Sequence, residues 1–87
     1  YYTSKAKIKC PEERKQALLD YFRKNAEGKV DDTDGVKILF DNGWVLLRPS
    51  GTEPIFRIYS ESKDAEVSET RANQYLAQAE EFLSKKD

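Results

Sequence analysis

Three short strand-like runs follow one another in the middle of this chain and restrict the fold that it can adopt, and the first and the last of them alternate along the chain. They cover residues 36–40, 44–48 and 55–60. Alternation with a period of two is typical of β-strands that bury one face. Asn42-Gly43, between the first two runs, is the preferred pair for a tight hairpin. The sequence therefore predicts neighbouring antiparallel strands in this region.

Further elements are predicted on both sides of these runs. Residues 3–9 alternate small apolar residues with lysines and are expected to form a short strand, and residues 30–32 another. Asp34-Gly35 signals a turn before the first central run. Pro11-Glu12-Glu13 is expected to open a helix, because proline is tolerated at the first helical position and acids favour the positive end of the dipole.

The predicted helices each have one apolar face. The first places four residues at helical spacing, and Gly28 is expected to end it in a left-handed cap. These four residues are Leu18, Leu19, Phe22 and Ala26. The second is expected to begin after Asp64 or Ser62 as its N-cap, with a broader apolar face. That face consists of Ala72, Tyr75, Leu76, Ala79, Phe82 and Leu83.

The resulting order is β-α-β-β-β-β-α, which predicts an α+β fold with two helices on one face of an antiparallel sheet. The 87 residues allow one small domain, residues 1–87. A balance of 15 basic and 16 acidic residues argues against a nucleic-acid-binding surface. No apolar run approaches the ~20 residues that cross a membrane, and the start has no signal-peptide pattern. The single Cys10 favours a reducing cytoplasmic compartment and an inert thiol, since the chain has no His.

The segment from Arg48 to Pro54, Arg-Pro-Ser-Gly-Thr-Glu-Pro, combines groups that suit a phosphate dianion. Arg48 has a planar fork of N–H donors that matches two phosphate oxygens. Ser50 and Thr52 each have a hydroxyl to donate. Gly51 can adopt positive φ, which would turn neighbouring N–H groups inward as an anion-binding nest. The two prolines restrict the loop and so lower the entropy cost of binding.

These residues also have structural interpretations. Arg48 could instead pair at the surface with Glu53 or another carboxylate. The two hydroxyls could bond their own backbone in a turn, which is compatible with binding. Glu53 would repel a dianion, so it is expected to point away, or to orient Arg48 or a sugar hydroxyl. Arg57 shares a strand face with Ile55 and Tyr59. A second contact to phosphate or hydroxyl and a solvent-facing strand arginine are equal alternatives for it.

The same segment resembles a known family. It is similar to the phosphate-binding loop in the last domain of the α-D-phosphohexomutases, which are the phosphoglucomutase, phosphomannomutase and phosphoglucosamine mutase enzymes. The similarity extends through residues 34–37, 42–44 and 54–58 and covers most of the chain. It implies a TATA-binding-protein-like fold with this order of elements. It also implies contacts to the substrate phosphate from Arg48, Ser50, Gly51 and Thr52. Arg57 is included with less weight.

The resemblance further implies the C-terminal substrate-binding domain of a longer cytoplasmic enzyme that interconverts hexose 1-phosphate and hexose 6-phosphate. In this family a phosphoserine donates its phosphoryl group, a bisphosphorylated sugar reorients, and the serine is rephosphorylated. Mg²⁺ is bound by a different domain, so no catalytic residue or metal ligand is expected here. Asp31, Asp32 and Asp34 do not match a calcium loop and are interpreted as a solvated turn. The start at Tyr1 rather than Met agrees with a domain taken from a longer protein.

The expected partners are then a phosphosugar and the other domains of the parent chain, not nucleic acid or a membrane, and the isolated chain is expected to be inactive. Two other functions are compatible with the sequence. A stand-alone module for nucleotides or phosphopeptides would use the same loop chemistry. A protein-interaction domain with a purely structural loop predicts no response to phosphate at all.

Overall fold

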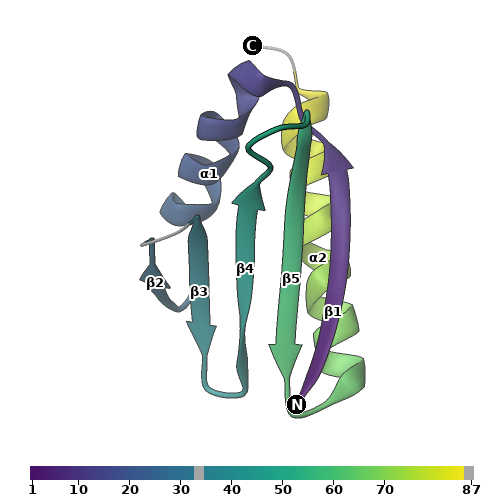
Figure 1. Ribbon diagram of the computed structural model, residues 1–87. Helices are drawn as coiled ribbons and strands as arrows, with labels where there is room; N and C mark the ends of the chain where they lie inside the picture. The colour runs from purple at the N-terminus through teal and green to yellow at the C-terminus, as the bar shows by residue number, and fades with distance from the viewer. Residues whose placement is uncertain (33–34, 86–87) are drawn as a thin grey trace.

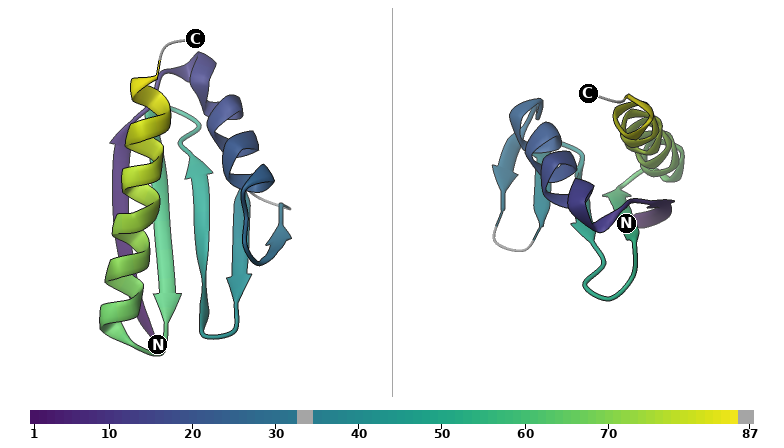
Figure 2. Two further views of the ribbon diagram at one scale, coloured as in Figure 1. Left: turned by 180° about the vertical axis from the view of Figure 1, so that it is seen from behind. Right: turned by 90° about the horizontal axis from the view of Figure 1, so that it is seen from above.

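The computed structural model describes residues 1–32 and 35–85 and has a five-stranded sheet with both helices on one of its faces (Figures 1 and 2). The predicted α+β class and order of elements are confirmed. In chain order the elements are β1 (Tyr2–Lys9), a 3₁₀ turn η1 (Glu12–Arg14), α1 (Lys15–Lys24), β2 (Lys29–Asp31), β3 (Val36–Phe40), β4 (Gly43–Pro49), β5 (Ile55–Ser62) and α2 (Ala65–Ser84).

The strands lie in the order β1-β5-β4-β3-β2, and every neighbouring pair is antiparallel. The alternation seen in the sequence separates the two faces of the sheet as predicted. The face under the helices carries fully buried residues, namely Val36, Ile38, Val45, Leu47, Phe56 and Ile58. Leu18 and Phe22 of α1 and Ala79 of α2 close the core from above. No helix of the described residues covers the other face (Figure 2).

The first helix differs from the prediction at both ends. Residues 12–14 form a 3₁₀ turn, and the α-helix begins only at Lys15 and ends at Lys24 with Asn25 as its C-cap. Gly28 lies beyond the helix and does not have positive φ. A Cβ there would meet the backbone carbonyl of Leu39. Glycine is therefore needed at position 28 for a close approach to β3, not for a left-handed cap.

The hairpin between β3 and β4 is shifted by one residue from the prediction. Phe40 is paired with Gly43, so Asp41 and Asn42 form the two-residue connection. Neither of these two residues has positive φ, whereas Gly43 has φ 153° within β4. A Cβ on Gly43 would meet the carbonyl of Glu61. Glycine is therefore needed at position 43 both for its φ, directly after the connection, and for the close contact between β4 and β5.

Of the two predicted N-caps of α2, the structure has Asp64 in this role. The Asp64 carboxylate accepts backbone N–H bonds from Glu66 at 2.9 Å and Val67 at 3.4 Å, which satisfies two donors that the helix leaves unpaired. Ser62 is buried and receives the backbone N–H of Asp64 instead. Neither helix in the described part of the chain has the length and apolar character needed to cross a membrane.

Cys10 is fully buried at the end of β1, and burial raises the pKa of its thiol above the ordinary value of 9.0. We expect iodoacetamide at pH 8 to modify the folded chain at least about 100 times more slowly than the chain unfolded in urea. Equal rates in the two states would contradict the buried position. Because the folded chain holds this proton where the unfolded chain has lost it, the group lowers stability as the pH rises above about 9.

Candidate phosphate site

The segment from Ser50 to Pro54 joins β4 to β5 at the end of the sheet where α1 begins (Figure 1). Backbone hydrogen bonds fix both of its ends. The N–H of Ser50 donates to the carbonyl of Ile55 at 2.9 Å, and the N–H of Cys10 donates to the carbonyl of Pro54 at 2.8 Å. The loop is thus tied to β5 and to the end of β1, and its conformation is set by the sheet below it.

The Ser50 side chain organises the turn from within. Its Oγ accepts the backbone N–H groups of Thr52 at 3.3 Å and Glu53 at 3.2 Å. This is the turn role that the sequence analysis gave as an alternative to phosphate binding. The two roles are compatible, because a hydroxyl that accepts two hydrogen bonds still has its own hydrogen to donate.

Gly51 lies exposed at the tip of the loop, and it does not have the positive φ that an inward-facing nest would require. The left-handed backbone that glycine permits here is therefore not used. The physical reason lies in its neighbours. The hydroxyl of Ser50 draws the two following N–H groups together, so the chain reverses without a left-handed residue.

Replacing Gly51 with alanine is expected to change the free energy of unfolding by less than about 0.5 kcal/mol. A Cβ at this position would have no other atom within 4 Å, and the backbone has a conformation that alanine adopts. Urea unfolding followed by circular dichroism measures the difference. A loss above about 1.5 kcal/mol would mean that the residue needs glycine's freedom after all.

Lys15 was missed by the sequence analysis and is the most buried charged residue at this end of the molecule. It is 6% exposed, and its Nζ donates to the carbonyls of Ser50 at 2.6 Å and Glu53 at 2.7 Å. The sequence does contain a pattern that could have identified Lys15. Lys15 precedes Leu18, Leu19 and Phe22 at helical spacing, so a lysine stands on the apolar face of α1.

Arg48 and Arg57 face each other across β4 and β5 as partners in the strand register. Both side chains therefore lie on the open face of the sheet, directly beside the loop. Arg48 is exposed and Arg57 is partly buried. The Glu53 carboxylate lies 3.8 Å from the Arg57 guanidinium. The structure places Glu53 against Arg57, a partner that the sequence analysis did not consider, in an exposed pair that contributes little to stability.

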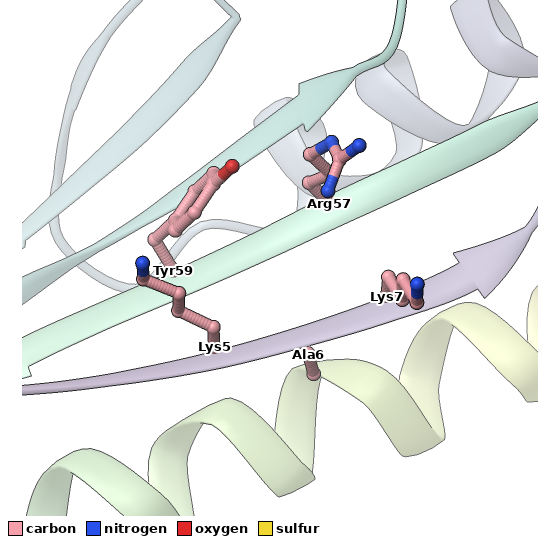
Figure 3. A pocket seen from close by; sticks show the side chains of 5 residues that line it. All are labelled: Lys5, Ala6, Lys7, Arg57 and Tyr59. Atoms are coloured by element: carbon pink, nitrogen blue, oxygen red, sulfur yellow. The ribbon is translucent and has the colours of Figure 1, made fainter. Parts of the chain in front are cut away.

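A shallow hollow continues this basic surface onto β1 (Figure 3). Lys5 and Lys7 of β1 line it together with Arg57 and Tyr59 of β5, and Ala6 points toward α2. Lys7 is the register partner of Arg57. Three cations thus stand in a row across β1, β5 and β4. Like charges opposite one another destabilise a sheet, so an anion bound here would relieve their repulsion.

The acidic residues near β2 do not join this site. Asp32 pairs with Arg23 of α1 at 3.3 Å, and Asp31 is exposed in β2. Asp34, the third member of the predicted acidic turn, lies outside the described residues. Within residues 1–32 and 35–85, no three His, Cys, Asp or Glu side chains are arranged to hold a metal ion.

Comparison with known proteins gives a consistent result. Residues 6–78 match the family of the phosphoglucomutase/phosphomannomutase C-terminal domain. The chain is 49% identical over 79 residues to a phosphoglucomutase/phosphomannomutase of Thermococcus kodakarensis, covering 87% of this chain and 16% of the relative. It is 41% identical over 73 residues to a phosphoglucosamine mutase of Methanococcus maripaludis, covering 79% of this chain and 16% of the relative. The chain thus spans about one sixth of the length of these relatives.

A solved structure shares the fold. A phosphoglucomutase/phosphomannomutase family protein from Burkholderia thailandensis superposes with a TM-score of 0.63 at 21% identity, over 88% of this chain and 16% of that one. At this identity the likeness concerns the fold alone. The family match and the curated relatives go further, and on their strength the chain belongs to the family of phosphoglucomutase/phosphomannomutase C-terminal domains.

Proposed function

We propose that this domain binds a phosphate group of the substrate in an enzyme that interconverts hexose 1-phosphate and hexose 6-phosphate. The observation that supports it most is the pairing of Arg48 and Arg57 beside an ordered loop of hydroxyls and backbone N–H groups. Two neighbouring guanidinium groups place two planar sets of N–H donors side by side. They are well suited to the planar, bidentate recognition of phosphate.

Each group has a distinct part in this proposal. The Arg48 guanidinium binds two oxygens of the phosphate, and Arg57 neutralises the remaining charge after exchanging its loose contact with Glu53 for the ligand. The Ser50 hydroxyl donates its hydrogen while its oxygen keeps the turn closed. Gly51 contributes a backbone N–H, and Thr52 a hydroxyl. No side chain of this domain enters the chemical step, so the isolated chain has no mutase activity.

Positioning is the contribution that phosphoryl transfer needs from such a domain. By holding the phosphate that is not being transferred, the loop presents the other end of the sugar to the phosphoserine of the parent chain. Binding energy gained at this remote group orients the reacting centre. A site that contacts mainly phosphate oxygens also accepts the sugar in either direction, as the reorientation of a bisphosphorylated intermediate requires.

The metal belongs elsewhere in this proposal. The loop offers mainly cations and hydroxyls, whereas Mg²⁺ is usually held by one or two carboxylates together with water and phosphate oxygens. We place the Mg²⁺ of the parent enzyme in another domain, where it supplies charge neutralisation at the transferred phosphoryl group. The residues of this chain bind, orient and help to exclude water from the phosphosugar.

An amide-resolved NMR titration of the 87-residue chain tests the proposal. Glucose 1-phosphate is expected to shift the signals of Arg48, Ser50, Gly51 and Thr52, and unphosphorylated glucose is expected to leave them unchanged. A mononucleotide serves as the competing phosphate ligand. Nucleotide-induced shifts on another surface, with a silent loop in glucose 1-phosphate, would favour the stand-alone binding module. No response to any phosphate compound would favour a protein-interaction domain.

A further inference from the structure

We propose that Lys15 is a positioning residue of the phosphate site, which orients the loop for its ligand without touching it. This inference rests on the function proposed above. Lys15 opens α1, and the loop lies between β4 and β5, so 35 residues of sequence separate Lys15 from the Ser50 carbonyl to which it donates. The contact is therefore a specific feature of the tertiary structure.

The hydrogen bonds of the ammonium group are complete. An ammonium has three N–H donors, and Lys15 Nζ has three acceptors: the Ser50 carbonyl at 2.6 Å, the Glu53 carbonyl at 2.7 Å and Glu12 Oε2 at 2.7 Å. A buried ammonium is tolerated only when it is paired and hydrogen-bonded in this way. The two carbonyls flank the loop tip, so one side chain holds both sides of the turn.

This contact determines where the loop's donors point. The peptide group that joins Ser50 to Gly51 is trans and planar, so its C=O and N–H point in opposite directions. The carbonyl points toward Lys15, which is on the core side. The N–H of Gly51 therefore points away from the core, toward the side from which a ligand arrives. Lys15 thus replaces the left-handed glycine of a nest as the device that turns a backbone N–H toward the anion.

The charge of Lys15 acts in the same direction as its hydrogen bonds. The side chain is 7% exposed, and its carboxylate partner Glu12 is 75% exposed. The lysine therefore lies in the less polar surroundings, where its field is screened less, and the carboxylate lies in solvent. The net effect at the loop is a positive potential from the core side, which favours binding of a dianion.

Two variants that break the same ion pair separate this role from a merely structural one. Lys15→Met removes the charge and both carbonyl contacts, and we expect it to weaken glucose 1-phosphate binding about tenfold in the NMR titration. Glu12→Gln removes only the opposing charge, and we expect it to strengthen binding about twofold at low salt. Lys24→Met, an exposed lysine of the same helix, changes the net charge equally and is expected to leave affinity unchanged.

The outcomes distinguish this inference from the proposed function. If the unaltered chain shows no loop response, the proposed function is wrong. If the unaltered chain binds but Lys15→Met binds within twofold of it, only the positioning role is overturned. Weaker binding in both Glu12→Gln and Lys15→Met would assign the ion pair to stability alone. Should Lys15→Met fail to fold, Glu12→Gln decides, and unchanged or weaker binding in that variant overturns the inference.

Discussion

Replacing Phe22 with alanine is expected to lower the free energy of unfolding by about 3–5 kcal/mol, the usual range for deleting a buried phenyl ring. Phe22 is 1% exposed, on the buried face of α1. The centroid of its ring lies 5.5 Å from the ring centroid of Tyr75 in α2 and 6.3 Å from that of Phe56 in β5. One side chain thus joins both helices to the sheet, and its removal leaves a cavity that none of these elements fills alone.

The size of the domain makes this loss severe. A chain of this length has a total stability of roughly 4–13 kcal/mol, so a single core deletion removes a large part of it. Partial unfolding of α1 would also move Lys15, because Lys15 and Phe22 belong to the same helix, seven positions apart. We therefore expect the variant to lose the ordered loop along with its core packing.

Urea unfolding monitored by circular dichroism measures this effect. Phe22→Leu keeps most of the apolar volume and is expected to cost less than about 1.5 kcal/mol. Lys24→Ala, at an exposed position of the same helix, is expected to stay within about 0.5 kcal/mol of the unaltered chain. A loss below about 1 kcal/mol for Phe22→Ala would mean that α1 is not packed on the sheet as described.

The elements that sequence analysis placed correctly are those governed by local periodicity. The three strand-like runs became β3, β4 and β5, and the residues at helical spacing, including Leu18 and Phe22, became the buried face of α1. Such patterns follow from which side of each element meets solvent, and that is written in consecutive residues. The same locality explains why Asp64 was one of the two candidate caps, between which the structure decides.

The features that sequence analysis placed wrongly depend on contacts between distant parts of the chain. A helix cap was predicted at Gly28 and a turn residue at Gly43, but a neighbouring strand passes close to each of them, and Gly43 also has positive φ. Gly51 permits left-handed backbone, but the turn does not use it and is shaped instead by Ser50 and Lys15. A local pattern does not reveal which carbonyl lies opposite a glycine, or which loop a buried lysine reaches.

Arg48→Ala is expected to weaken binding of glucose 1-phosphate to the domain by about 10- to 100-fold, since a hydrogen bond to a charged group contributes about 1.5–3 kcal/mol. Stability should change by less than about 1 kcal/mol, because the residue is exposed and its removal relieves the like charge of Arg57 across the strands. The NMR titration gives the affinity, and urea unfolding gives the stability of the same sample.

Arg48→Lys is the sharper of the two substitutions, because it keeps the charge and removes the planar fork. A lysine binds phosphate as a point charge, whereas arginine binds two oxygens at once, so we expect lysine to restore only part of the lost affinity. Arg23→Ala provides the matched control for a lost arginine, since Arg23 pairs with Asp20 and Asp32 far from the loop. Full affinity in Arg48→Lys would reduce the role of Arg48 to electrostatic attraction. Full affinity in Arg48→Ala would show that Arg48 is not part of the site. Arg57 and Lys7, the other two cations in the row across β4, β5 and β1, would then be the ones that hold the phosphate.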